Sequence, residues 1–253
     1  MSDRGNEMIQ TEEIQYACGG ATLRGLLAVN PEAKGPRPAV LVVHEWWGRG
    51  EYVEKRARML AEAGYVGFAI DLYGEGAQAE TAEQAKAMMN DAFSDLGRLK
   101  ARFEAAIEAV KERPEVDASA ISAIGYCFGG AVVIFMAREG LDLRAVAAFH
   151  PGSLDLGAPT KPGAVKAEVA AFVGADDPMV PTDRHEAFRA DMAAAGAKAE
   201  LVVFPGVVHA FTNPGATERG ERFGLPLRYD AHADEVSWKK TLELFSRAAA
   251  PRA

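Results

Sequence analysis

The sequence predicts an α/β fold, in which a mostly parallel sheet carries helices on both faces. Short apolar runs recur along the chain, and all but 120–126 end in Gly, Pro, His or Asp; they occupy residues 39–44, 65–71, 120–126, 145–150, 167–174 and 199–205. Because these runs lack polar alternation, they suit strands that are buried on both faces. Helical patterns lie between them, and this alternation is typical of a mostly parallel sheet.

The helices are predicted from apolar stripes and from the glycines that follow them. Residues 51–64 carry one such stripe, and Gly64 is suited to end the helix. The segment 81–113 is predicted to hold two helices that break near residues 94–97. Further helices are predicted at residues 129–138, 182–195 and 234–248. An N-terminal hairpin is expected at about 9–30, and residues 213–232 are expected to form one long ordered loop.

Length and composition favour one domain that spans residues 1–253. The chain has 253 residues, of which 49% are hydrophobic, and this is enough for a sizeable core. A net charge of −8 and the absence of a basic run argue against nucleic acid as a partner. No apolar run approaches a membrane span, and no metal-ligand spacing or cofactor motif is present. Two cysteines and an N-terminus without an apolar signal region indicate the cytoplasm.

The segment G-Y-C-F-G-G, residues 125–130, carries the strongest chemical signal. Cys127 stands where a predicted strand runs directly into a predicted helix, with Gly125 and Gly129 two residues away on either side. This arrangement resembles a nucleophile elbow, with Cys in place of the usual Ser. A helix N-terminus favours a thiolate, and the Phe128 N–H could hold an oxyanion. The alternative is a buried core thiol in a glycine-rich turn.

A thiol nucleophile needs a base and a group that orients the base, and these follow it in chain order in this type of fold. Asp177, just past the predicted strand 167–174, is the preferred acid, and Asp176 is the second choice. The alternative for either aspartate is a turn or capping residue. His209 follows the predicted strand 199–205 and is the candidate base. His44 and His150 also end strands, whereas His185 is expected at the surface and His232 at a helix cap.

With these residues in place, the chain resembles the dienelactone hydrolases, a cysteine branch of the α/β-hydrolase fold. The matching segments are V-V-H-E-W-W-G, D-L-Y-G, G-Y-C-F-G-G, G-A-D-D-P-M-V-P and G-V-V-H-A-F-T-N-P, and they span about residues 39–214. The resemblance implies a carboxymethylenebutenolidase-type enzyme with Cys127 as nucleophile, His209 as base and Asp177 as its orienting residue. It implies a small ester or lactone as substrate, and no metal or organic cofactor.

The resemblance also implies roles for two residues near the first strand end. Glu45 would accept a hydrogen bond from the resting thiol and take part in its conversion to thiolate when substrate binds. The backbone N–H of Trp46 would be the second oxyanion donor. The alternative for Glu45 is a surface carboxylate at the start of a loop.

One departure from the family concerns the substrate. The dienelactone-specific members carry two arginines that bind the substrate carboxylate, and the corresponding positions here are Glu75 and Asn213. The candidates to replace them are Arg49, Arg219, Arg222 and Arg228. A neutral ester or lactone is therefore at least as well suited as an anionic one. The residues expected to line the substrate site are Trp47, Tyr73, Tyr126, His150, Phe211 and Asn213, and the aromatic residues among them have plain core packing as their alternative.

Two other functions stay open. The chain could be a binding protein that kept the fold without turnover, or a thiol redox sensor based on Cys127. A sensor would lack a resolving cysteine nearby in the sequence, because Cys18 lies in the predicted hairpin. The sequence does not indicate an oligomeric state.

Overall fold

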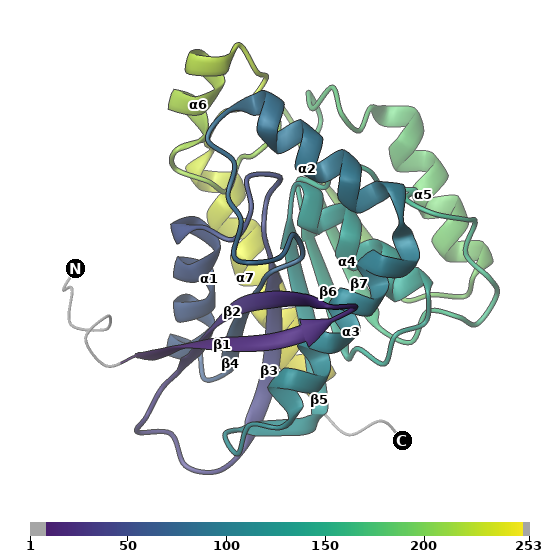
Figure 1. Ribbon diagram of the computed structural model, residues 1–253. Coiled ribbons are helices and arrows are strands. Elements are labelled where there is room, and N and C mark those ends of the chain that lie inside the picture. The colour runs from purple at the N-terminus through teal and green to yellow at the C-terminus, as the bar shows by residue number, and fades with distance from the viewer. Residues whose placement is uncertain (1–8, 250–253) are drawn as a thin grey trace. The chain divides into compact units, whose positions relative to one another are not determined.

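The computed structural model describes residues 9–249 (Figure 1). These residues divide into two compact units with the boundary between Ala123 and Ile124. The prediction of one domain stays a prediction. The sequence predicts an N-terminus without an apolar signal region. The first eight residues, to which this prediction applies, lie outside the described residues.

Eight strands and seven helices follow one another along the described chain. The strands are β1 (Gln10–Cys18), β2 (Ala21–Val29), β3 (Arg37–Val43), β4 (Val66–Ile70), β5 (Val116–Tyr126), β6 (Ala145–Phe149), β7 (Glu168–Gly174) and β8 (Ala199–Phe204). The helices are α1 (Glu51–Glu62), α2 (Ala82–Ser94), α3 (Leu96–Lys111), α4 (Phe128–Arg138), α5 (Thr182–Ala194), α6 (Ala216–Phe223) and α7 (Ala231–Ala248).

In the first unit, four strands pair in the order β1-β2-β4-β3. The predicted hairpin is confirmed: β1 and β2 are antiparallel, and Gly19 and Gly20 in the turn between them both have positive φ. Strand β4 runs antiparallel to β2 and parallel to β3. Helices α1 and α3 both pack on β4, and all five residues of that strand are buried, so its two faces are covered as predicted.

The break between α2 and α3 falls at Asp95, inside the predicted interval. Asp95 ends α2 in a non-helical conformation, and its side chain accepts a hydrogen bond from the Arg98 N–H in the first turn of α3. Asp is among the residues that cap a helix N-terminus best. The same residue therefore ends one helix and starts the next.

In the second unit, β6, β7 and β8 are parallel and adjacent in that order. Helices α4 and α7 pack on β6, all of whose residues are buried, and α5 packs on β8. Strand β8 departs from the prediction of burial on both faces: only Phe204 is buried. The reason is that β8 ends the strand order, and an edge strand has a neighbour on one side only.

The expectation of one long loop over residues 213–232 is wrong. This segment contains α6, and α7 starts at Ala231. Gly215 and Gly224 flank α6, and Gly220 lies inside it, so the sequence has the appearance of a loop. Gly220 is required there because a Cβ at this position would lie 2.5 Å from the Leu227 carbonyl oxygen. The helix therefore packs directly on the segment that returns from it.

A buried arginine fixes the long connection after β6. Arg138, at the end of α4, donates hydrogen bonds to the carbonyl oxygens of Leu156 (2.9 Å) and Ala158 (2.7 Å) and to the Thr160 hydroxyl (2.7 Å). It also forms an ion pair with Asp191 of α5 at 3.3 Å, and its side chain is 5% exposed. One guanidinium thus provides the hydrogen-bond donors for several acceptors of a loop that has no regular secondary structure.

Replacing Arg138 by leucine should lower the free energy of unfolding by about 3 kcal/mol, because two carbonyls and the carboxylate of Asp191 lose their donor. The matched control is Arg189→Leu on α5, whose guanidinium makes one exposed 3.5 Å contact with the Leu201 carbonyl. The control should change stability by less than about 0.5 kcal/mol. Urea unfolding measures both variants, and equal effects would contradict this role of Arg138.

Candidate active site

Cys127 occupies a sharp corner between β5 and α4, in the second unit. Its backbone has φ 53° and ψ −111°, a conformation that costs a non-glycine residue about 1–3 kcal/mol. Two hydrogen bonds maintain it: the Cys127 N–H donates to the Phe149 carbonyl (3.1 Å), and the Cys127 carbonyl accepts from the Gly152 N–H (2.9 Å). The end of β6 and the loop after it therefore fix the corner from outside.

The flanking glycines are present because the backbone leaves no space for a side chain. A Cβ on Gly125 would lie 2.0 Å from the Gly129 carbonyl oxygen. A Cβ on Gly130 would lie 2.9 Å from Cα of Pro151, two residues after the end of β6. The first contact makes the turn tight, and the second allows α4 to lie close to β6.

The thiol lies where a helix N-terminus provides positive electrostatic potential. Cys127 is 7% exposed and directly precedes α4, whose first residue is Phe128. The first N–H groups of a helix have no partner inside the helix, and together with the helix dipole they favour an anion at this position. The corner can therefore stabilise a thiolate or a developing oxyanion.

His209 and Asp177 are joined by a short hydrogen bond. Nδ1 of His209 lies 2.7 Å from Oδ2 of Asp177, and both residues are almost fully buried. The other carboxylate oxygen, Oδ1, accepts a hydrogen bond from the Met179 N–H at 2.9 Å. Both oxygens of Asp177 are thus engaged, which sets the direction of the carboxylate. Asp176, the second choice from the sequence, is exposed.

The loops that carry these two residues approach each other closely. The Asp176 N–H donates to the Val207 carbonyl at 3.0 Å, and a Cβ on Gly174 would lie 2.1 Å from the same oxygen. On its other side, the His209 carbonyl accepts from the Arg228 N–H at 3.1 Å, and His209 forms a parallel bridge with Leu227. The segment that returns from α6 thus supports the histidine loop.

The charges around His209 favour its protonated form. Burial alone lowers the pKa of His209, but the negative charge of a Cys127 thiolate and the hydrogen bond to Asp177 outweigh it and raise the pKa to about 10. Nε2 is buried and makes no hydrogen bond of standard geometry within residues 9–249. The Cys127 side chain acts on His209 through its charge and also through a hydrogen bond outside standard geometry, and both raise the pKa of His209.

His150 lies against His209, and Thr212 holds it there. The two imidazole centroids are 5.1 Å apart in an edge-on arrangement, and Nε2 of His150 lies 2.7 Å from the Thr212 hydroxyl. His150 has φ 36°, and its N–H donates to the Phe172 carbonyl at 2.8 Å. Thr212 was not identified from the sequence. A threonine three residues after His209 is the signal that could have pointed to it.

The other predicted residues of this unit differ in their surroundings. Tyr126 is fully buried and stacks on Phe149 with centroids 4.8 Å apart. Phe211 is also fully buried and packs edge-on against His150. The side chain of Asn213 accepts a hydrogen bond from the Gly215 N–H, in the turn that leads into α6.

The predicted residues of the first unit gather at the ends of β3 and β4. Glu45 is buried, and the Tyr73 hydroxyl donates to the Trp46 carbonyl at 3.0 Å. The Trp46 and Trp47 rings meet edge-on at 5.0 Å. Burial lowers the pKa of His44, so its ring stays neutral, and its Nε2 accepts from the Leu72 N–H while Nδ1 donates to the Glu45 carbonyl. This histidine is a structural bridge between two strand ends.

Two further expectations have different outcomes. His185 was expected at the surface, but it is 2% exposed, because it lies on the face of α5 that also buries Phe188 and Met192. His232 is exposed in the first turn of α7, where Asp230 is the capping residue.

Within residues 9–249, no three His, Cys, Asp or Glu side chains gather in a way that could hold a metal ion. No helix in that range is both long and apolar enough to cross a membrane.

Comparison with known proteins agrees with the class that the strands and the corner define. A solved structure of a dienelactone hydrolase-like promiscuous phosphotriesterase from metagenomic libraries is 31% identical, with a TM-score of 0.90 over 96% of this chain and 100% of the other. "Protein usf" of Aquifex pyrophilus is 27% identical over 92% of this chain and 96% of its own. A protein of Escherichia coli K12 that is provisionally named carboxymethylenebutenolidase is 28% identical, over 85% of this chain and 79% of its own.

The fold is that of the α/β-hydrolases, and the protein is a hydrolase. Residues 23–249 match the model of the dienelactone hydrolase family, so the chain belongs to that family.

The tight corner can be tested with glycine substitutions. Gly125→Ala should lower the free energy of unfolding by about 3 kcal/mol or more, because its Cβ would overlap a backbone oxygen that cannot move freely. Gly152→Ala is the matched control, since its Cβ would meet the nearest atom at an ordinary 3.8 Å. Thermal and urea unfolding measure both variants. If Gly125→Ala is as stable as the control, the corner is not sterically required.

Proposed function

We propose that the protein hydrolyses the ester or lactone bond of a small uncharged substrate through a thioester on Cys127. His209 is the base, and Asp177 orients it. The observation that carries the proposal is the buried Asp177–His209 hydrogen bond of 2.7 Å on a ring whose strongest favourable charge interaction is with Cys127. Nucleophile, base and orienting acid in this relation are the components of acyl transfer by a catalytic triad.

In the first half of the reaction, Sγ of Cys127 attacks the carbonyl carbon and the carbonyl oxygen becomes an oxyanion. The Phe128 N–H, at the start of α4, is the proposed donor to that oxyanion. The bond from carbon to the leaving oxygen then breaks, and Nε2 of His209 gives its proton to that oxygen. The product is a thioester between Cys127 and the acyl group, and an alcohol is released, or stays attached when the substrate is a lactone.

In the second half, His209 is neutral and accepts a proton from water through Nε2. The resulting hydroxide adds to the thioester carbon, and the carbon–sulfur bond breaks. Cys127 leaves as thiolate, and His209 is protonated again. Asp177 keeps the tautomer constant in both halves, because its Oδ2 accepts from Nδ1 throughout. The roles that the family resemblance implies for Glu45 and Trp46 stay predictions.

An uncharged substrate is supported by the residues at the two positions where the dienelactone-specific members of the family carry arginines. Glu75 forms an exposed ion pair with Arg24, and the Asn213 side chain is engaged with the Gly215 N–H. Among the possible replacements, Arg228 donates to the Gly206 carbonyl and Arg222 lies over the Phe223 ring. These contacts give each of the two arginines a structural partner.

A second activity, hydrolysis of phosphotriesters, is favoured by the 31% identity to a promiscuous phosphotriesterase. Phosphotriesters are also uncharged, and attack by a thiolate at phosphorus needs the same nucleophile and base. Aryl phosphotriesters therefore belong in the same substrate panel as aryl esters and lactones.

The nucleophile can be tested because the chain has only one other cysteine. Cys127→Ala should lower kcat/KM for aryl esters by at least about 10³-fold, since no thioester can form. Cys18→Ala is the control, as Cys18 is a half-exposed thiol at the end of β1, and its loss should leave kcat/KM unchanged.

Unchanged hydrolysis in the Cys127→Ala variant would rule out the thioester. A wild-type protein that binds esters without turnover would support a binding function instead. Peroxide oxidation of Cys127 without any esterase activity would favour a redox sensor.

The charge interaction between Cys127 and His209 predicts a pH dependence. The raised pKa of His209 stabilises the folded state fully below the ordinary value of 6.5, and this contribution is lost as pH rises through about 10. NMR of the ring nitrogens should therefore find His209 protonated at neutral pH in the wild type. In Cys127→Ala the largest favourable charge is gone, and the ring should lose its proton at a clearly lower pH. Identical titration in the two proteins would contradict the interaction.

A further inference from the structure

We infer that the outer face of α7 is a self-complementary surface on which a second copy of this chain docks, antiparallel and related by a two-fold axis. This surface is separate from the site around Cys127, and the inference does not depend on the proposed function. A shallow, largely open depression of about 760 Å³ lies along this face, and all of its lining residues belong to α7; they are Glu235, Trp238, Lys239, Leu242, Glu243, Ser246 and Arg247.

Four exposed charges run along this face at intervals of four residues. They are Glu235, Lys239, Glu243 and Arg247, which we call the α7 charge row. Residues four apart lie above one another on the same side of a helix. The signs along the row alternate, from acidic at the N-terminal end to basic at the C-terminal end.

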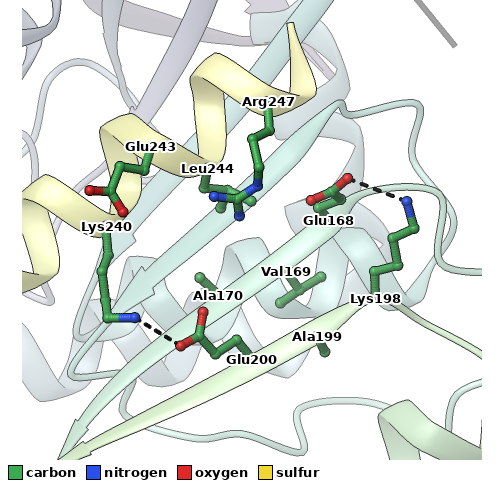
Figure 2. Close-up of a pocket in the computed structure, with 10 residues that line it drawn as sticks. All are labelled: Glu168, Val169, Ala170, Lys198, Ala199, Glu200, Lys240, Glu243, Leu244 and Arg247. Carbon is green, nitrogen blue, oxygen red and sulfur yellow. Dashed lines mark hydrogen bonds and ion pairs between the residues drawn. The ribbon is translucent and has the colours of Figure 1, made fainter. Parts of the chain in front are cut away.

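The charge row is available because its members have no partners within residues 9–249: none of the four makes an ion pair or a side-chain hydrogen bond there. Their neighbours do pair. Lys240 lies 3.0 Å from Glu200, and this pair is visible beside Glu243 and Arg247 in Figure 2. In the same view, Lys198 is paired with Glu168 at 3.5 Å. Pairing is therefore the rule around the row but not within it.

A second copy is the partner that this row fits. When an antiparallel copy is laid against it, the order of signs is reversed, so that Glu235 meets Arg247 of the copy and Lys239 meets Glu243 of the copy. All four contacts then join opposite charges. A parallel copy would place equal charges opposite each other. A two-fold interface uses the same patch on both subunits, so self-complementarity of this kind is what it requires.

Two large side chains beside the row supply the apolar part of the contact. Trp238 and Leu242 are half-buried, lie one helical turn apart, and line the same shallow depression. Aromatic residues are enriched in the centres of interfaces. The row spans about 18 Å of helix at 1.5 Å per residue, which is small for an interface. The dimer should therefore be weak, and salt should weaken it further because the charges are exposed.

The test is a charge exchange measured by sedimentation equilibrium, from micromolar to near-millimolar protein and at low and high salt. The wild type should dimerise, with weaker association at high salt. Lys239→Glu alone and Glu243→Lys alone should each raise the dissociation constant by at least about tenfold, because each puts two pairs of like charges in contact. An equal mixture of the two variants should restore association, since every contact in the mixed dimer again joins opposite charges. The double variant should also restore it.

The matched control is Lys161→Glu, an exposed lysine of the loop after β6, which should leave the dissociation constant unchanged. Circular dichroism checks that all variants are folded. Three results would overturn the inference: a wild type that stays monomeric over the whole range, single variants that associate like the wild type, or a mixture that associates no better than its components.

Discussion

The backbone conformation of Cys127 is the constraint on which the rest of the second unit depends. A cysteine with φ 53° would relax to an ordinary conformation if its neighbours allowed it. They do not: its N–H and its carbonyl are both hydrogen-bonded to the segment around the end of β6, and Gly125 lies so close to Gly129 that a Cβ there would be 2.0 Å from the Gly129 carbonyl oxygen. The strain is thus maintained by packing, and it holds the thiol at the end of a helix.

The side chains of Asp177 and His209 are also positioned by backbone packing, in this case by close contact between the loops at the ends of adjacent parallel strands. Gly174 lets the loop after β7 touch the loop after β8, and this contact brings Asp177 within 2.7 Å of His209. The hydrogen bond from Met179 then fixes the carboxylate. Few side-chain contacts are needed to position Asp177 and His209, because backbone contacts between the loops set most of their geometry.

The sequence was most informative where the backbone is most restricted. Glycines around Cys127, and apolar runs that are followed within a few residues by Asp177 and His209, were sufficient to predict the strands and to place these residues at neighbouring strand ends. Helix α6 was missed because Gly215, Gly220 and Gly224 give the segment the appearance of a loop, although Gly220 is required by the contact of the helix with the returning chain. Thr212 was missed because its hydrogen bond to His150 joins residues 62 apart in sequence. Its position three residues after His209 places it near the site but does not indicate which residue it binds.

The account is tested most directly by a search for the covalent intermediate. When His209→Asn is mixed with an activated aryl ester, water attack on the thioester should slow more than acylation, and intact-protein mass spectrometry should detect one added acyl group. Fragmentation should place that group on Cys127. An acyl group on a serine or on Cys18, or full turnover of the ester by Cys127→Ala, would contradict the account.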